Sequence, residues 1–119
     1  MNHKIKYVFV ALCLMFAVNL NANSNGLLWN SANDAYSMGQ YETALNDYLK
    51  IEENGVHSYK LYYNIGNAYY KTGSMGKAIL YYEKALKTDP SYSDARFNLE
   101  LLNSTIQDRI DPVPEFVMK

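Results

Sequence analysis

Apolar residues recur at helical spacing along two consecutive stretches in the middle of the chain. The first stretch ends at Lys71-Thr72-Gly73-Ser74, a typical helix stop. The second begins near Met75 and ends at Asp89-Pro90, because proline lacks the N–H that would continue a helix. The apolar or small positions are Tyr62, Ile65, Gly66 and Tyr69 in the first stretch, and Ala78, Ile79, Tyr82, Ala85 and Leu86 in the second. This pattern predicts a helical hairpin.

The hairpin pattern occurs more than once, with a period of about 34 residues, and such a period is the signature of a solenoid. Identical or similar residues coincide after one shift by this period at Asn30/Asn64, Asn33/Asn67, Tyr36/Tyr70, Gly39/Gly73, Ala44/Ala78, Leu45/Ile79 and Tyr48/Tyr82. A further shift brings Tyr63 onto Phe97 and Asn64 onto Asn98. We therefore expect two full units, at about residues 25–58 and 59–92, within an all-α helix-turn-helix solenoid.

Small residues at the hairpin positions predict a close approach of the two helices in each unit. Gly66 and Ala78 occupy these positions in the second unit, and Ala32 and Ala44 occupy them in the first. Because their side chains are short or absent, the helix axes can come together while aromatic side chains fill the space between layers.

One more helix is predicted from about residue 91 to 106, and it would cap the open end of the second unit. Its apolar residues are Phe97, Leu99, Leu101, Leu102 and Ile106, and its polar residues are Asp94, Arg96, Glu100 and Asn103. Terminal units of solenoids need a polar outer face. About three units are usually needed for stability, so two and a half also leave self-association open.

Residues 1–22 have the organisation of an export signal. Lys4 and Lys6 precede an apolar run over residues 8–18, and Ala22 is a small residue suited to cleavage. The run is shorter than the roughly 20 apolar residues of a membrane span. An uncleaved N-terminal anchor stays open as the alternative. Because Leu12 precedes Cys13 and further apolar residues follow, the pattern argues against a lipoprotein signal.

Charge and composition give no indication of nucleic-acid binding, metal binding or catalysis. Loss of residues 1–22 would change the formal net charge from −1 to −3, and no basic cluster is present. It would also remove Cys13 and His3, which leaves His57 as the only imidazole and no disulfide. No paired His/Cys spacing and no glycine-rich phosphate loop occurs. We expect a protein that is not an enzyme and that uses no cofactor.

The string YYNIGNAYYKTGSMGKAILYYEKALKTDP resembles a near-consensus tetratricopeptide repeat (TPR). The first unit departs from that pattern, with Ser31 where an apolar residue is usual and Ile51 where alanine is usual. The resemblance implies protein binding through the first helix of each unit. The residues expected to line that concave groove are Trp29, Asn30, Asn33, Tyr36, Lys60, Tyr63, Asn64, Asn67, Tyr70, Lys71, Phe97 and Asn98, with Leu101 beside them.

The groove residues form an aromatic column, Trp29, Tyr63 and Phe97, beside a column of asparagines. Asparagine can donate to and accept from the backbone of an extended peptide, and aromatic residues are enriched at binding hot spots. The same residues could instead serve packing and hydrogen bonding between units, so both roles stay open here. A chaperone-type carboxylate clamp is not expected, because Trp29, Asp94 and Asn98 stand where it needs basic side chains.

The chain as a whole resembles the N-terminal part of the TPR protein of Bat (aerotolerance) operons in Bacteroidetes. The resemblance rests on residues 29–36, 61–71 and 95–101, and on the tail QDRIDPVPEF at residues 107–116. It implies an exported, periplasmic protein, attached to the inner membrane through an uncleaved or a missing segment, with residues 107–119 as an extended tail. The implied partners are von Willebrand A-type membrane proteins. A structural, self-assembling helical-repeat element is the alternative function.

Overall fold

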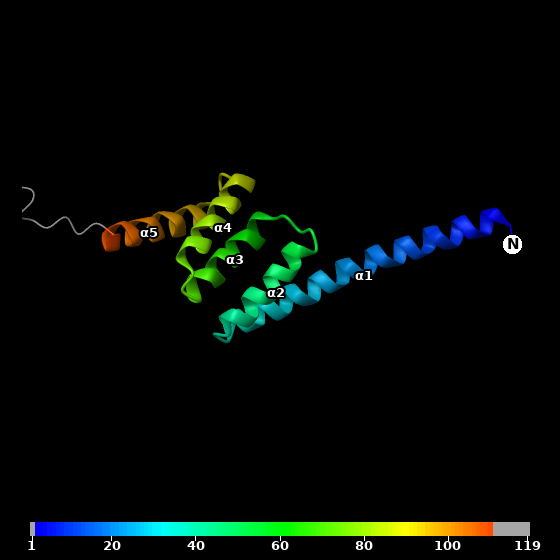
Figure 1. The fold of residues 1–119 in the computed structure, drawn as a ribbon, viewed down its shortest axis with the longest axis horizontal. Coiled ribbons are helices and arrows are strands. Elements are labelled where there is room, and N and C mark those ends of the chain that lie inside the picture. Colours follow the sequence, from blue (N-terminus) through cyan, green and yellow to red (C-terminus); the bar gives the residue numbers. More distant parts are fainter. Residues whose placement is uncertain (1, 111–119) are drawn as a thin grey trace, which may run out of the picture. The chain divides into compact units, whose positions relative to one another are not determined.

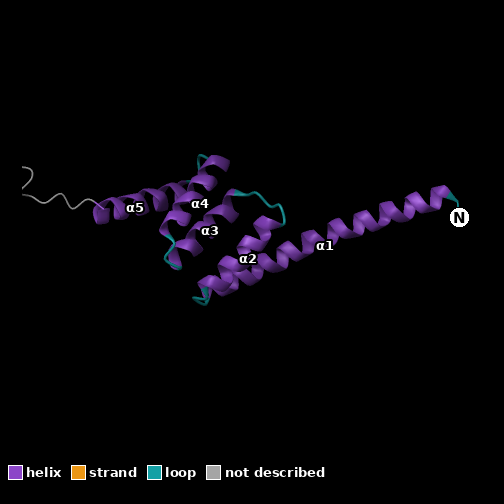
Figure 2. Cartoon of the chain, in the orientation of Figure 1, coloured by secondary structure: helices purple, strands orange, loops and turns teal. Residues whose placement is uncertain are grey.

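The computed structural model describes residues 2–110, apart from the side chains of residues 17–22 and 110. The described residues form helices and the loops between them (Figures 1 and 2). The helices are α1 (His3–Ser37), α2 (Tyr41–Glu53), α3 (Tyr59–Lys71), α4 (Met75–Thr88) and α5 (Ser93–Ile110). Unit 1 extends to Val56 and contains α1 and α2, while unit 2 begins at His57 and contains α3, α4 and α5. The all-α helical-repeat prediction is confirmed.

The two hairpins turn in the same way, at glycines that occupy equivalent positions of the repeat. Gly39 has a φ of +79° and Gly73 a φ of +87°, the left-handed conformation that glycine adopts without a steric penalty. The N–H after each glycine bonds back to a helix carbonyl, at 2.8 Å in unit 1 and 2.9 Å in unit 2. This is a Schellman-type helix end. The sequence period is therefore also a structural period.

Close packing of α3 on α4 depends on the absence of a side chain at Gly66. A Cβ placed there would lie 2.7 Å from Cε1 of Tyr82, well inside ordinary contact distance. Tyr82 and Ala78 are buried together with Leu102 of α5. The predicted role of the small residues in unit 2 is confirmed.

The capping helix α5 packs against α4 through only some of its apolar residues. Leu102 is buried in the common core, and Leu99 and Ile106 pack beside it. In contrast, Phe97 and Leu101 are exposed, by 66% and 55%. The polar face of α5, with Arg96, Glu100 and Asn103, is exposed as expected of a capping helix.

The last helix is longer than the sequence pattern predicts. The prediction ends it near residue 106, whereas α5 continues to Ile110, because the first residue that forbids a helix is Pro112. The predicted extended tail therefore cannot begin at residue 107. Its remaining residues, 111–119, lie outside the described part of the chain.

In unit 1, α2 covers only a part of the long helix α1. A rise of about 1.5 Å per residue gives α1 a length of roughly 50 Å and α2 roughly 20 Å. The core of the hairpin consists of Ala32, Ala35, Ala44, Tyr48 and Ile51, and large apolar side chains of residues 5–16 are exposed. The helix continues through Ala22. Export and cleavage there stay predictions.

None of the described helices combines the length and the apolar content that crossing a membrane requires.

Candidate functional site

A tyrosine–asparagine hydrogen bond recurs in both hairpins. Tyr48 Oη donates to Asn33 Oδ1 at 2.5 Å in unit 1, and Tyr82 Oη donates to Asn67 Oδ1 at 2.6 Å in unit 2. Burial raises the pKa of Tyr48 to about 12, so its hydroxyl remains a proton donor even above pH 10. Each of these bonds joins the two helices of one hairpin. Two asparagines of the predicted groove therefore have a role within the fold.

Asn98 connects the capping helix to the hairpin of unit 2. Its Nδ2 donates to Asn67 Oδ1 at 3.1 Å and approaches Tyr63 Oη at 3.3 Å. Asn67 Oδ1 therefore accepts from two side chains, which uses both lone pairs of a carbonyl oxygen. The Asn98–Asn67 bond stabilises the docking of α5 next to α3.

The aromatic column also pairs with the second helix of each hairpin. The ring centroids of Trp29 and Tyr48 are 5.7 Å apart, and those of Tyr63 and Tyr82 are 6.0 Å apart. Tyr92, which sequence reasoning did not single out, packs edge-on against Tyr63 at 5.1 Å. Burial, and then its neighbour Tyr63, raise the pKa of Tyr92. The only sequence feature that could have indicated Tyr92 is its position just after Pro90, which stops the preceding helix.

The structure distributes the predicted groove residues over two helices of unit 2 and one helix of unit 1. Asn30, Lys60, Tyr70, Lys71 and Phe97 are exposed, while Trp29, Asn33, Tyr36, Tyr63, Asn64, Asn67 and Asn98 are half-buried. Lys60, Tyr63, Asn67 and Tyr70 follow one face of α3, since each is three or four positions from the next. Asn98 brings α5 next to that face. A single groove across both units stays a prediction.

We call the outer part of this region the α3–α5 surface, which comprises Lys60, Tyr63, Tyr70, Phe97 and Leu101. Phe97 and Leu101 are one helical turn apart and therefore neighbours on α5. Tyr70 of α3 is 46% exposed. The surface thus combines aromatic and aliphatic side chains with an exposed lysine.

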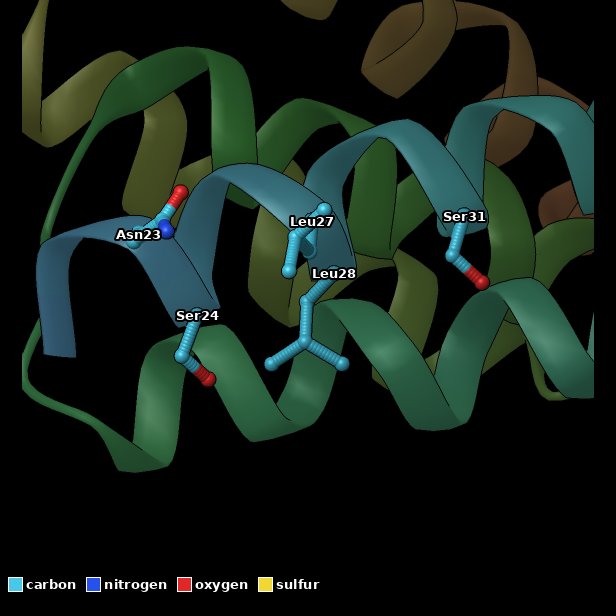
Figure 3. A pocket seen from close by; sticks show the side chains of 5 residues that line it. All are labelled: Asn23, Ser24, Leu27, Leu28 and Ser31. Atoms are coloured by element: carbon cyan, nitrogen blue, oxygen red, sulfur yellow. The ribbon is translucent and has the colours of Figure 1, made fainter. Parts of the chain in front are cut away.

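Unit 1 contains a shallow groove of about 470 Å³ on α1. It is lined by Asn23, Ser24, Leu27, Leu28 and Ser31 (Figure 3). Ser31 Oγ donates to Asp47 Oδ2 of α2 at 2.8 Å. The unusual serine at position 31 was the only sequence signal for this site, and the sequence did not indicate a groove.

Among the described residues, no group of three or more His, Cys, Asp or Glu side chains is placed to hold a metal ion.

Residues 59–92 match the family model of the tetratricopeptide repeat. The match covers α3, the turn at Gly73 and α4, which is the second predicted unit. Comparison with curated proteins gives no match. The fold and the repeat together define a helical-repeat module of the kind that mediates protein–protein interaction and is typically not an enzyme.

Proposed function

We propose that this chain is an exported adaptor that binds a protein partner through the α3–α5 surface. The observation that carries the proposal is the exposure of Tyr70, Phe97 and Leu101, by 46%, 66% and 55%, next to the Asn98 junction. Large apolar side chains gathered on one surface mark interaction sites in soluble proteins. Aromatic residues at such a site supply much of the binding energy.

The arrangement of these residues suits a peptide segment or a small domain surface. The polar groups of Asn67 and Asn98 are bound to each other and hold α3 and α5 in register. A partner would therefore contact rigid aromatic side chains on two fixed helices, which lowers the entropy lost on binding. Lys60 is exposed on the same face of α3 and would favour an acidic flank on the partner.

The finer assignment comes from the family resemblance. It makes the chain a periplasmic component of an aerotolerance complex with von Willebrand A-type membrane proteins, attached directly or indirectly to the inner membrane. The support for export is the pattern of residues 1–22, and the support for the complex is the resemblance of residues 29–36, 61–71, 95–101 and 107–116. By this resemblance, the chain would hold its protein partner near the inner membrane.

The experiment compares two variants for binding peptides selected from a phage-displayed library on the wild-type protein. Phe97→Ala with Leu101→Ala removes the apolar part of the surface. Leu80→Ala is the matched control, because Leu80 is an exposed leucine on α4. We expect the double variant to lose about tenfold or more in affinity, since hot-spot truncations cost at least ~1–2 kcal/mol.

Equal affinity of the double variant and the control, measured by calorimetry, would refute the α3–α5 surface. A soluble von Willebrand A-type domain is the probe for the finer assignment, and its failure to bind would refute that assignment alone. Asn67 is unsuitable as a target, because its loss also breaks the bonds to Tyr82 and Asn98.

The outer face of α5 gives no support to the self-assembling alternative. This face carries Arg96, Glu100 and Asn103, which are exposed and polar. A stacking interface would need apolar side chains at these positions. Sedimentation at several concentrations tests the alternative, and a monomer throughout would remove it.

A further inference from the structure

The groove of unit 1 is next to repeat positions that carry tyrosine rings in unit 2. By the repeat period, Leu28 corresponds to Tyr62, and Asp47 corresponds to Tyr81. In unit 2 these tyrosines are 7% and 9% exposed, with ring centroids 6.2 Å apart. Leu28 lines the unit 1 groove of about 470 Å³, and Asp47 bonds to Ser31, which also lines it. The groove thus includes a repeat position that carries an aromatic ring in unit 2 and an aliphatic side chain in unit 1.

A lysine covers the tyrosine layer of unit 2. The Nζ atom of Lys84 lies 5.3 Å from the ring centroid of Tyr62 and 4.7 Å from that of Tyr81. These distances are within the range of cation–π attraction. The corresponding lysine of unit 1 is Lys50, which is exposed on α2. Unit 1 has kept the cation but not the rings beneath it.

The polar groups of the groove also differ from those of unit 2. Ser31 takes the place of the fully buried Ile65, and its hydroxyl donates to Asp47 Oδ2 at 2.8 Å. In Figure 3, Ser24, Leu28 and Ser31 point from α1 toward α2. A carboxylate accepts more than one hydrogen bond, so a ligand with a donor group at the end of a ring would find an acceptor at Asp47.

We propose that the unit 1 groove binds a tyrosine side chain of a partner protein. The phenol ring lies against Leu28 as the ring of Tyr62 lies in unit 2, and its hydroxyl donates to Asp47. Lys50, the counterpart of Lys84 in the repeat, covers the ring face by cation–π attraction. The carboxylate selects tyrosine over phenylalanine, because an apolar ring would leave the carboxylate without compensation for its lost water. This site is on unit 1 and is separate from the α3–α5 surface.

The probe for this site is 4-methylphenol, titrated into the full chain and followed by ¹H–¹⁵N correlation spectra. We expect saturable shifts of the Ser24, Leu28, Ser31 and Asp47 amides with a dissociation constant on the order of 1–10 mM, as for a ligand of this size. Toluene, which lacks the hydroxyl, should bind at least about threefold more weakly. Shifts that do not saturate, or that saturate equally for toluene, would overturn the proposal.

Two variants test whether the groove itself is occupied. Leu28→Tyr restores the unit 2 residue and should abolish the shifts, whereas Leu80→Tyr adds the same side chain on the exposed surface of α4 and should leave them unchanged. Asp47→Leu removes the acceptor and should weaken 4-methylphenol to the level of toluene. Ser31→Ala is its control, because it breaks the same Ser31–Asp47 bond and keeps the carboxylate. Wild-type binding by folded Leu28→Tyr or by Asp47→Leu contradicts the assignment, and the Asp47 arm decides if Leu28→Tyr does not fold.

Discussion

Replacement of Gly66 by alanine tests whether the close approach of α3 and α4 holds unit 2 together. The added Cβ would lie 2.7 Å from Cε1 and 2.8 Å from Cδ1 of Tyr82, whereas ordinary contacts of this kind are 3.4–4 Å. The ring of Tyr82 would have to move by several tenths of an ångström or more. It is 2% exposed, and its hydroxyl is bound to Asn67, so little free space is available for that movement.

Two effects of opposite sign decide the size of the change. Alanine favours a helix over glycine by about 1 kcal/mol, while overpacking a core typically costs about 1–3 kcal/mol. Gly76→Ala is the control, because Gly76 lies in α4 and a Cβ there would meet nothing within 4 Å. The control includes a propensity gain without the clash. We therefore expect Gly66→Ala to be less stable than Gly76→Ala by about 1–3 kcal/mol.

Urea unfolding followed by circular dichroism measures this difference, and thermal unfolding should show it as a gap of roughly 4–20 °C between the variants. Unit 1 provides a further comparison, because Ala32 stands there at the repeat position of Gly66, and Tyr48 at that of Tyr82. Gly66→Ala being as stable as Gly76→Ala would show that the ring of Tyr82 moves freely, which would refute the close-packing argument.

Two further predictions concern the hydrogen bonds of the hairpins. Burial raises the pKa of Tyr48 from 10.0 to about 12, so the folded state holds this proton more tightly than the unfolded state. The contribution of Tyr48 to stability is then complete below about pH 10 and declines as the pH rises toward about 12. Urea titrations at several pH values should show a smaller decline for Tyr48→Phe than for the wild-type protein. An equal decline in both proteins would contradict this prediction. Asn98→Ala should lower the stability of α5 by about 1 kcal/mol, since it removes a donor to Asn67. Hydrogen exchange of the α5 amides should accelerate in Asn98→Ala but not in the control Asn103→Ala, which changes an exposed residue. Identical exchange in these two variants would show that the Asn98–Asn67 bond contributes nothing to the stability of α5.

Local features of the fold follow directly from residue types and spacing. The left-handed turns at Gly39 and Gly73 are predictable, because few other residues adopt a positive φ without strain. The end of α5 was placed too early, since the sequence from Gln107 to Ile110 has no residue that stops a helix. The helix α1 begins at His3, inside the predicted export signal. The sequence pattern did not predict this helix, because one apolar stretch can be both a processing signal and a helix.

The candidate site was only partly predictable. The sequence predicted a partner-binding face that includes Asn33, Asn67 and Asn98. It could not show whether these amides are exposed or bonded within the fold, because both cases have the same sequence signature. The structure shows that all three take part in bonds within their own unit. Their distances to Tyr48 and Tyr82 depend on how two helices pack, which is a tertiary quantity. Phe97 was expected in the same column as Trp29 and Tyr63, and only the packing of α5 shows that it is much more exposed.

The repeat period by itself determined the helical hairpins, their glycine turns and the small residues at their crossings, because each of these depends on backbone conformation or side-chain size at one position. Only the tertiary structure decided which polar groups bind each other and where a side chain is missing. The repeat positions of Tyr62 and Tyr81 carry Leu28 and Asp47 in unit 1. Whether such a substitution is absorbed by repacking or leaves a groove depends on the surrounding side chains, and in unit 1 a groove remains beside Leu28.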